Sequence, residues 1–394
     1  MNKKTIKDLT IKGRRVLMRV DFNVPQDEAG NITDDKRIRA ALPTIKYAVD
    51  QGAKVVLMSH LGRPKGKANP KYSLAPAAKR LSELLGRDVK MLGDCIGPDV
   101  KAAVDAASAG DVILLENVRF YKEETDNDPG FAEKLAQSGD VFVNDAFGTC
   151  HRAHASTEGI TKFLPSASGF LVQKEIEYFE KATKAPQKPY VAILGGAKVS
   201  DKIVVIENLL NKVDAILIGG GMAYTFLKAQ GIAIGNSKLE ADRIEVAKKI
   251  LSDAKGKNVK ILLPVDHVAA DKLSADADAK QIDGAAIPDG LLGLDIGPKT
   301  TQLFKDELKS AKTIVWNGPV GVFEMERFAK GSRDIADFIA GLDATTIIGG
   351  GDTAAAIAKF GLEDKMSHIS TGGGASLEYL EGKTLPGVAA LEDK

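Results

Sequence analysis

Short apolar runs alternate with amphipathic stretches along the chain. Most of these runs are continuously apolar and do not alternate with polar residues, which is typical of strands covered on both faces of a sheet. Nine such runs stand out: VLMRVDFNV, KVVLMSHLG, DVILLENVRF, DVFVNDAFG, YVAILGGA, AILIGGG, KILLPVD, TIVWNGPVGVF and TTIIGGGD. Helical patterns separate them, so the sequence predicts strands joined by helices in parallel α/β sheets.

One helical pattern near the middle divides the chain into two halves. Within segment 169–190, apolar residues at helical spacing precede two prolines that would end a helix: Phe170, Leu171, Ile176, Phe179, Pro186 and Pro189. The chain has 394 residues, and a prior of about 100–200 residues per domain favours two domains. We therefore predict two parallel-sheet domains connected by this helix.

The composition is that of an ordinary globular protein. Hydrophobic residues make up 44% of the chain and the net charge is +1, which gives no sign of a nucleic-acid surface. The basic start MNKKTIKDLTIKGRR lacks the apolar core of a signal peptide, and no run approaches the ~18 apolar residues of a membrane span. We expect a cytoplasmic protein. The charged block KEETDND at 122–128 is predicted to be a solvated loop.

The two cysteines, Cys95 and Cys150, lie far apart in the sequence and form no disulfide framework. Cys150, His151 and His154 are close enough in sequence to suggest a metal site. A structural zinc site needs four ligands, however, and only Cys95 remains to supply another sulfur. The sequence therefore argues against metal binding by this cluster.

Ten of the thirteen arginines precede the connecting helix. Six cationic or ionisable side chains follow the strands predicted in the first half: Arg37, His60, Arg63, Arg119, His151 and Arg152. Ligands of open α/β sheets bind outside the carboxyl ends of the strands, so these side chains are expected to converge. Guanidinium groups suit phosphate and carboxylate, which predicts an anion pocket. Any one of these arginines by itself is better explained as a solvated surface charge, but four of them at strand ends together favour a binding site.

Asp21 and Asn23 end the first predicted strand. An acid among arginines can orient a guanidinium or accept a hydrogen bond from a substrate hydroxyl. The alternative is a turn formed by the Asp and Asn side chains, and these two residues alone do not decide between the two.

The second half is rich in glycine where the first is rich in arginine. Five segments place glycines after strands: LGGAKVSDK, IGGGMAY, NGPVG, IIGGGDT and STGGGAS. Backbone N–H groups at helix starts bind phosphate, and glycine permits its close approach. Any one of these segments could be a tight turn packed for structural reasons, but five together are hard to explain by packing alone.

The segment IIGGGDT at 347–353 matches neither common nucleotide motif. No acid follows at the distance that a dinucleotide-binding loop needs, and the lysine and serine or threonine of a P-loop are missing. Asp352 and Thr353 instead place a carboxylate beside a hydroxyl at a predicted helix start. A carboxylate next to polyphosphate requires a cation between them, so this loop predicts a Mg²⁺-nucleotide site.

Lys198 and Lys202 are spaced i, i+4 in GGAKVSDK. If a helix begins here, both ammonium groups share a face at its N-terminus, where the helix dipole disfavours cations. A bound polyphosphate would compensate this cost.

Taken together, the motifs of this chain resemble those of a known family, phosphoglycerate kinase. Its motifs occur here in order and at approximately the family's spacing: RVDFNVP, SHLGRP, LLENVRF, NDAFGTCHRAH, LGGAKVSDK, GGGMA, WNGPVGVFE, IIGGGDT and STGGGASLE. They extend from residue 19 to residue 378, essentially the whole chain. The set is more diagnostic than any single motif, and no position that the family uses departs from its pattern.

The resemblance implies reversible phosphoryl transfer between 1,3-bisphosphoglycerate with ADP and 3-phosphoglycerate with ATP. The implied reaction depends on Mg²⁺, and the phosphoryl group passes directly and in line after the hinge closes. It implies two Rossmann-like parallel-sheet domains joined by a hinge helix. The boundaries expected are 1–170 for phosphoglycerate, 171–189 for the hinge helix and linker, 190–374 for the nucleotide, and 375–394 for a C-terminal segment packing back on the first domain. It also implies a monomer whose partners are small molecules, with no nucleic acid and no membrane.

The family's functional residues carry over by position. The substrate set implied is Asp21, Asn23, Arg37, His60, Arg63, Arg119 and Arg152. The nucleotide set implied is Lys202, Gly219, Gly220, Asn317, Pro319, Glu324, Gly350, Gly351, Asp352 and Thr353, with Glu324 at the ribose and Asp352 at the metal. The residues expected to act on the transferred group are Arg37, Lys198, Lys202, Gly351 and Gly374.

Two other functions stay open on the sequence alone. A nicotinamide oxidoreductase would need a ribose-binding acid at the right distance and a hydride-transfer site. A non-catalytic module that binds phosphorylated metabolites would explain the arginines but not the five glycine-rich segments.

Overall fold

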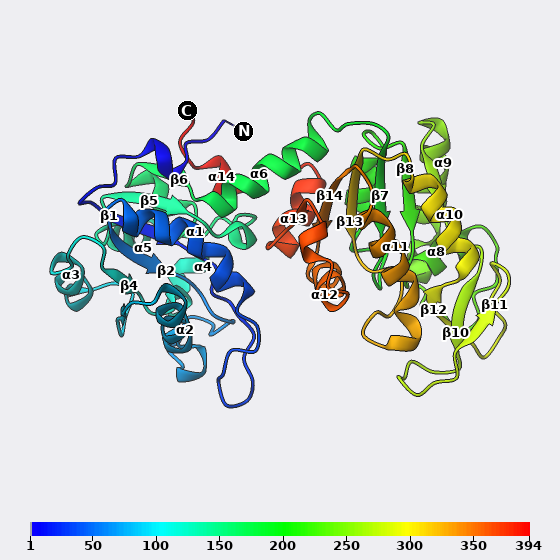
Figure 1. Cartoon of the computed structure of the whole chain (residues 1–394), viewed down its shortest axis with the longest axis horizontal. Helices are drawn as coiled ribbons and strands as arrows, with labels where there is room; N and C mark the ends of the chain where they lie inside the picture. Colours follow the sequence, from blue (N-terminus) through cyan, green and yellow to red (C-terminus); the bar gives the residue numbers. More distant parts are fainter. Residues whose placement is uncertain (1) are drawn as a thin grey trace. The chain divides into compact units, whose positions relative to one another are not determined.

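The computed structural model describes residues 2–394, and the chain forms two compact units (Figure 1). The first unit holds the chain up to Glu177 together with Thr384–Lys394, and the second holds Tyr178–Lys383. No helix within residues 2–394 is long and apolar enough to cross a membrane.

The first unit is built on a six-stranded parallel sheet with the strand order β3-β4-β2-β1-β5-β6. Its strands are β1 (Arg15–Arg19), β2 (Lys54–Met58), β3 (Val89–Met91), β4 (Val112–Leu114), β5 (Val141–Asn144) and β6 (Ser166–Ser168). Its helices are α1 (Lys36–Asp50), α2 (Ala75–Leu85), α3 (Pro98–Asp105), α4 (Lys122–Thr125), α5 (Pro129–Ala136) and α14 (Pro386–Ala389).

Helices cover both faces of this sheet, which explains why its strands are continuously apolar. Val16 and Met18 of β1 belong to a core cluster with residues of α1 and α2. Leu17, between them, belongs to a second cluster with residues of α3 and α5. Successive side chains of a strand point to opposite faces, so a strand covered on both sides needs apolar residues at every position.

The second unit repeats this plan with the strand order β15-β14-β13-β7-β8-β9, again all parallel. The strands are β7 (Tyr190–Leu194), β8 (Ala215–Ile218), β9 (Lys260–Leu262), β13 (Thr313–Asn317), β14 (Thr345–Gly349) and β15 (His368–Ile369). The helices are α7 (Ile203–Leu209), α8 (Ala223–Ala229), α9 (Ile244–Gly256), α10 (Pro298–Leu308), α11 (Lys330–Ala340), α12 (Gly351–Lys359) and α13 (Gly373–Leu380). Residues of α10, α11 and α12 share one core cluster with the sheet.

A small antiparallel sheet in the second unit was not predicted. It consists of β10 (His267–Ala270), β11 (Lys280–Ile282) and β12 (Leu292–Ile296), in the order β11-β10-β12. These strands are short and partly polar, so they lack the continuous apolar runs that identified the parallel strands.

The predicted connecting helix is α6 (Phe170–Thr183), and the boundary between the units falls within it. Two side chains of the first unit accept hydrogen bonds from its free N-terminal N–H groups. Asp145, after β5, accepts from Leu171 N (2.9 Å), and Thr44 of α1 accepts from Phe170 N (3.0 Å). Burial raises the pKa of Asp145 to about 6.

The chain returns to the first unit later than the expected boundary at residue 375. Residues 375–383 lie in the second unit, because α13 packs against α7 and its Leu380 carbonyl accepts a hydrogen bond from Asn208. The return begins at Thr384: Asn144 Nδ2 donates to Gly387 O (2.9 Å), and Lys4 N donates to Glu392 O (2.8 Å). Figure 1 accordingly shows the red C-terminal end beside the blue N-terminus.

Substitution of Leu391 tests how far this tail stabilises the first unit. Leu391 is 2% exposed and belongs to the core cluster with α3 and α5. We expect Leu391→Ala to lower the free energy of unfolding by about 2–4 kcal/mol, measured by urea denaturation followed by circular dichroism. The exposed pair of Lys394 and Asp8 offers a control, since Lys394→Ala should cost less than about 1 kcal/mol. Equal, small losses in both variants would contradict a stabilising tail.

Candidate active site

The first unit gathers its polar side chains where the strand order reverses direction. β1 lies between β2 and β5, and the chain moves from β1 to opposite sides of the sheet. Ligands of open parallel sheets bind at such a point, outside the carboxyl ends of the strands. Asp21, His60 and Arg152 follow β1, β2 and β5 respectively.

Arg37 is tied to the end of β1 from the first turn of α1. Its Nη1 donates to Asp21 Oδ2 (3.0 Å) and to Asn23 O (3.1 Å). Asn23 Oδ1 accepts from Gly62 N (2.8 Å), which links this segment to the loop after β2. The Arg37 side chain keeps 37% of its surface exposed, so its remaining donors can reach a ligand.

Arg119 lies in the short 3-10 helix Val118–Phe120 after β4, with its guanidinium largely buried. Nη1 donates to Gly62 O (3.0 Å), but Nε has no hydrogen-bond partner among the described residues although it is buried. Burial, reinforced by Arg19, lowers the pKa of Arg119 to about 10. A buried donor without a partner costs free energy, and an anion would satisfy it.

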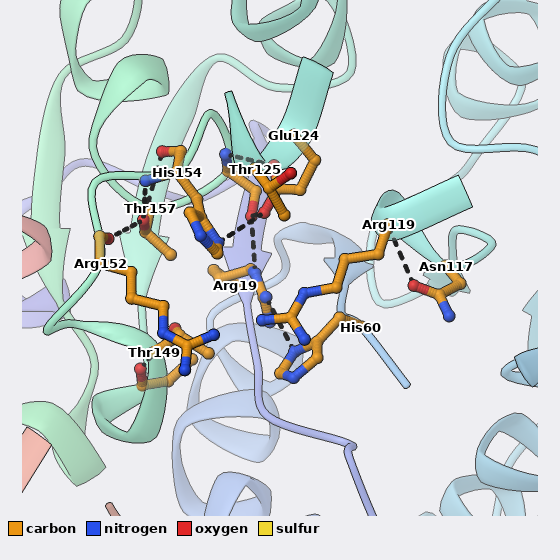
Figure 2. Close-up of polar contacts among 12 residues, drawn as sticks. Arg19, His60, Asn117, Arg119, Glu124, Thr125, Thr149, Arg152, His154 and Thr157 are labelled. Atoms are coloured by element: carbon orange, nitrogen blue, oxygen red, sulfur yellow. Dashed lines mark hydrogen bonds and ion pairs between the residues drawn. The ribbon is translucent and has the colours of Figure 1, made fainter. Parts of the chain in front are cut away.

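His60 lies among these cations and is itself buried. Burial, together with Arg19, Arg119 and Arg37, lowers the pKa of His60 well below its usual value. The imidazole is therefore neutral at pH 7. Figure 2 shows the guanidinium groups of Arg119 and Arg152 turned toward the side on which the His60 ring lies.

A cavity of about 470 Å³ opens between the loops that carry three of the arginines. Its lining residues are Arg63, Pro64, Lys65, Gly66, Arg119, Tyr121, Lys122, Thr125 and Arg152. The guanidinium of Arg152 is exposed, and its Nε donates to His151 Nε2 (3.1 Å). The cavity therefore offers several cationic donors to one anion.

In the second unit the strand order reverses at β7, which lies between β13 and β8. Lys202 follows β7, and its Nζ donates to the side-chain oxygen of Asn317, the last residue of β13. Burial lowers the pKa of Lys202, and the nearby carboxylates of Asp201 and Asp352 oppose this shift. The ammonium group of Lys202 and the amide of Asn317 thus come together at the reversal point.

The two helices that follow β14 and β15 bring their N-termini side by side. In α12 the first helical hydrogen bond runs from Ala354 N to Gly350 O (3.1 Å), and in α13 from Ser376 N to Gly372 O (2.7 Å). The N–H groups before these donors have no acceptor within their helix. A Cβ on Gly373 would lie 3.6 Å from Gly351 N, and one on Gly351 would meet nothing within 4 Å. The geometry offers a double set of backbone donors with open space beside them.

Other glycines of this unit have a packing role, which the sequence argument underestimated. A Cβ on Gly195 would lie 2.1 Å from Pro319 O, and one on Gly220 would lie 2.7 Å from Gly196 N. Gly220 also has a φ of +65°, which side chains rarely adopt. The loops after β7, β8 and β13 therefore pack backbone against backbone. We expected the five glycine segments to be hard to explain by packing alone, but packing does account for glycines in these three loops.

Asp352 is the only acid in the first turn of α12, and its side chain is exposed. Among the described residues no three His, Cys, Asp or Glu side chains form a metal-binding group. The single carboxylate of Asp352 suits Mg²⁺, which is commonly held by one or two carboxylates together with phosphate oxygens and water. Asp352 would hold the ion, whose charge would offset that of the phosphates.

The comparisons with known proteins agree on one family. The family model described as phosphoglycerate kinase matches residues 6–383. A phosphoglycerate kinase of Chlorobium limicola is 58% identical over 100% of both chains, and a cytosolic phosphoglycerate kinase of Triticum aestivum is 59% identical over 99% of this chain and 98% of its own. The solved structure of phosphoglycerate kinase from Coxiella burnetii superposes with a TM-score of 0.90 at 45% identity over 98% of each chain.

The chain belongs to the phosphoglycerate kinase family. It is a kinase that transfers a phosphoryl group reversibly between 1,3-bisphosphoglycerate with ADP and 3-phosphoglycerate with ATP. The oxidoreductase and binding-module alternatives are therefore wrong. Its two parallel-sheet α/β domains match the fold of the solved family members.

Within the first unit of this kinase, the structure brings the predicted side chains together. Asp21, Asn23 and Arg37 are hydrogen bonded to one another, and Arg63, Arg119 and Arg152 line one cavity. The neighbouring Cys150 is fully buried, and burial raises the pKa of its thiol to about 12.

The second unit differs from the predictions in detail. Lys198 and Lys202 do not share a helix face, because α7 begins only at Ile203, and Lys198 is exposed. Thr353 is fully buried, and its hydroxyl accepts from Gly318 N (2.7 Å), so it first of all ties α12 to the loop after β13. Pro319 is buried and Glu324 exposed.

Sequence reasoning missed a buried polar group behind the arginines. The segment 122–128, expected to be a solvated loop, begins with α4, and its Glu124 has no exposed surface. Glu124 accepts hydrogen bonds from Ser156, which also accepts one from Arg19. The neighbouring carboxylates of Glu123 and Asp126 are exposed, and no periodicity in so short a stretch distinguishes the buried one.

His154 makes the stability of the kinase depend on pH. Burial, together with Arg119 and Arg19, lowers the pKa of His154 to about 3 from 6.5. The unfolded chain therefore binds one proton more than the folded chain as pH falls below about 6.5, which lowers the free energy of unfolding by about 1.4 kcal/mol per pH unit. Above pH about 6.5 the imidazole is neutral in both the folded and the unfolded chain, so this loss of stability is absent.

We expect His154→Gln, which cannot titrate, to remove this part of the pH dependence. Between pH about 7 and about 5 the wild type should lose about 1–2 kcal/mol more than the variant. Urea denaturation at several pH values measures this, in buffers free of phosphate and sulfate because such anions bind to cationic sites. Parallel profiles for the two proteins would show that His154 does not remain neutral.

Proposed function

We propose that the cationic side chains of the first unit bind 3-phosphoglycerate and 1,3-bisphosphoglycerate. His60, Arg63, Arg119 and Arg152 would hold the 3-phosphate, while Asp21, Asn23 and Arg37 would contact the glycerate. The observation that carries this assignment is Arg119, whose buried Nε has no partner among the described residues and whose neighbours include the cations Arg19 and Arg152. A dianionic phosphate would supply the missing acceptor and relieve the repulsion.

The second unit, in the same proposal, binds ADP and ATP as their Mg²⁺ complexes. The N-termini of α12 and α13 would hold the phosphates through backbone N–H groups, with Asp352 serving the ion. Lys202 would contact the phosphates from the loop before α7. Gly219, Gly220, Asn317 and Pro319 would border the adenosine, and Glu324 the ribose, as the family's pattern implies.

Phosphoryl transfer places few chemical demands on the protein beyond positioning and charge stabilisation. In the ATP-forming direction the attacking group is an ADP oxygen, and in the reverse direction it is a carboxylate that is already ionised at pH 7. Neither needs a general base, so the neutral His60 is free to serve as a hydrogen-bond donor. We assign charge stabilisation of the moving phosphoryl group to Arg37 and Lys202, supported by Lys198 and by Gly374 in the first turn of α13.

A direct in-line transfer requires reacting atoms to approach to about 3–3.5 Å with water excluded. If the two substrates bind to different units, the units must move together in each cycle. We propose α6 as the hinge, since the chain passes between the units within this helix. We also propose that the enzyme acts as a monomer in the cytoplasm, in keeping with the cytosolic relative from Triticum aestivum.

Two neighbouring arginines of α1 provide a matched test of the catalytic assignment. Arg37 bonds to Asp21 at the end of β1, whereas Arg39 bonds to Asp35 (2.8 Å) at the surface. We expect Arg37→Ala to lower kcat by about 10²–10³-fold, because one charge-stabilising donor is lost. Arg39→Ala should leave kcat nearly unchanged. A near-normal kcat of Arg37→Ala at saturating substrates would remove Arg37 from its role.

Substitution of Asp352 tests the metal assignment. Asp352→Asn keeps the shape of the side chain but removes the charge that would hold Mg²⁺, so the free Mg²⁺ concentration at half-maximal activity should rise by at least about 10-fold. Activity is measured while free Mg²⁺ is varied at constant nucleotide. Asp364→Asn, an exposed acid of the same unit, serves as the control. If both variants and the wild type require the same Mg²⁺ concentration, Asp352 is not the ligand.

A further inference from the structure

Arg19, the last residue of β1, is a wholly buried arginine with no assigned role in the transfer reaction. Its guanidinium makes three hydrogen bonds to different parts of the first unit. Nε donates to Ser156 Oγ (2.8 Å), and Nη1 donates to Val20 O (2.5 Å). Nη2 lies 3.1 Å from Nδ1 of His60. Burying a cation is costly, so a fully buried arginine needs a reason beyond packing.

The contact with His60 fixes where the imidazole carries its proton. A guanidinium has only donors and stays protonated in proteins, so Arg19 Nη2 must donate and His60 Nδ1 must accept. Because His60 is neutral, it carries a single N–H. This hydrogen is therefore on Nε2.

The Nε2–H group is available for a ligand. Within residues 2–394, the only hydrogen bond found for the His60 ring is the one between Nδ1 and Arg19, and the ring lies among the arginines at the carboxyl end of β2. In the other tautomer, Nε2 would direct a lone pair at the site and would repel an anion. The tautomer thus decides whether His60 attracts or repels a phosphate.

A buried carboxylate holds Arg19 in place through a serine. Ser156 accepts from Arg19 Nε, so its own hydroxyl hydrogen is free to donate to Glu124 Oε1 (2.6 Å). Ser156 N donates to the second oxygen, Glu124 Oε2 (2.9 Å). Glu124 is also among the groups that oppose the lowering of the Arg19 pKa by burial. Glu124, Ser156, Arg19 and His60 therefore form one hydrogen-bonded chain with a defined direction. Figure 2 labels Glu124, Arg19 and His60 of this chain.

We propose that Arg19 is a positioning residue: held by Ser156 and Glu124, it keeps His60 as the Nε2–H tautomer and so presents an N–H donor to the phosphate of the three-carbon acid. The proposal rests on the proposed function in one respect, namely that His60 contacts this phosphate. The tautomer itself is a property of the free protein.

The test uses a variant that removes the donor without leaving a buried charge unpaired. Arg19→Met alone would strand the carboxylate of Glu124 and could unfold the chain. The double variant Arg19→Met/Glu124→Gln removes both charges together, and Glu124→Gln alone is its matched control. An unchanged circular dichroism spectrum shows that a variant is folded, and an unchanged affinity for Mg-ADP, measured by calorimetry, shows that the second unit is intact.

The first measurement is nitrogen NMR of the full-length protein labelled with ¹⁵N-histidine, assigned with His60→Gln. In the wild type, His60 Nδ1 should resonate as an unprotonated nitrogen and Nε2 as a protonated one. In the double variant the two forms should mix, whereas Glu124→Gln alone should keep the wild-type pattern. An Nδ1–H tautomer in the wild type, or an unchanged tautomer in the double variant, would overturn the proposal.

The second measurement is the affinity for 3-phosphoglycerate. Loss of one well-oriented hydrogen bond to a charged group corresponds to a weakening of about 10- to 100-fold, which we expect for the double variant. His60→Gln should show whether His60 contacts the ligand at all. If His60→Gln binds normally, the assigned contact of His60 fails while the tautomer result still stands. If His60→Gln weakens binding and the double variant does not, the role of Arg19 is refuted.

Discussion

Mutual repulsion among cations at one edge of the first sheet is the constraint on which this unit depends. Arg19, Arg119 and Arg37 lie close enough to His60 to help lower its pKa, and Arg19 and Arg152 act on Arg119 in the same way. Such a group holds together only where the scaffold positions it rigidly. Four strand ends and the start of α1 supply that rigidity, and the buried Glu124 offsets part of the charge. An anionic ligand would complete the balance, so the phosphate binding that we propose would follow from a charge that the fold leaves partly uncompensated.

For the second unit we also propose a phosphate-bearing ligand, bound by different chemistry. Its donors are mostly backbone N–H groups at the starts of α12 and α13, which attract phosphate without bringing full charges together. The loops after β7, β8 and β13 are packed so closely that only glycine fits at Gly195 and Gly220. One cation, Lys202, is buried beside Asn317 and near Asp352. A site of this kind suits a nucleotide whose phosphates arrive with Mg²⁺ and so carry less net charge.

Much of this arrangement could be predicted, because parallel strands obey simple rules. Strands covered on both faces must be apolar throughout, and their carboxyl ends must meet at one edge. Arg63, Arg119 and Arg152 were therefore expected to converge from their positions after strands alone, and they line one cavity. The short strands β10, β11 and β12 escaped prediction because they follow no such rule. The possible helix start at Lys198 was not found, because i, i+4 spacing of two lysines is equally compatible with a loop. In that loop, Glu240 accepts hydrogen bonds from Val199 N and Ser200 N.

The sequence by itself determined the fold class, the unequal distribution of arginine and glycine between the halves, and the family, since each depends on residue type and order along the chain. Only the tertiary structure decided how individual polar groups are paired. Glu124 and Arg19 are 105 positions apart in the numbering, yet they share Ser156 within the core. A carboxylate in a run of charged residues is indistinguishable from its exposed neighbours until folding buries it. Hydrogen-bond direction, and with it the tautomer of His60, depends on distances of a few ångström that no linear pattern specifies.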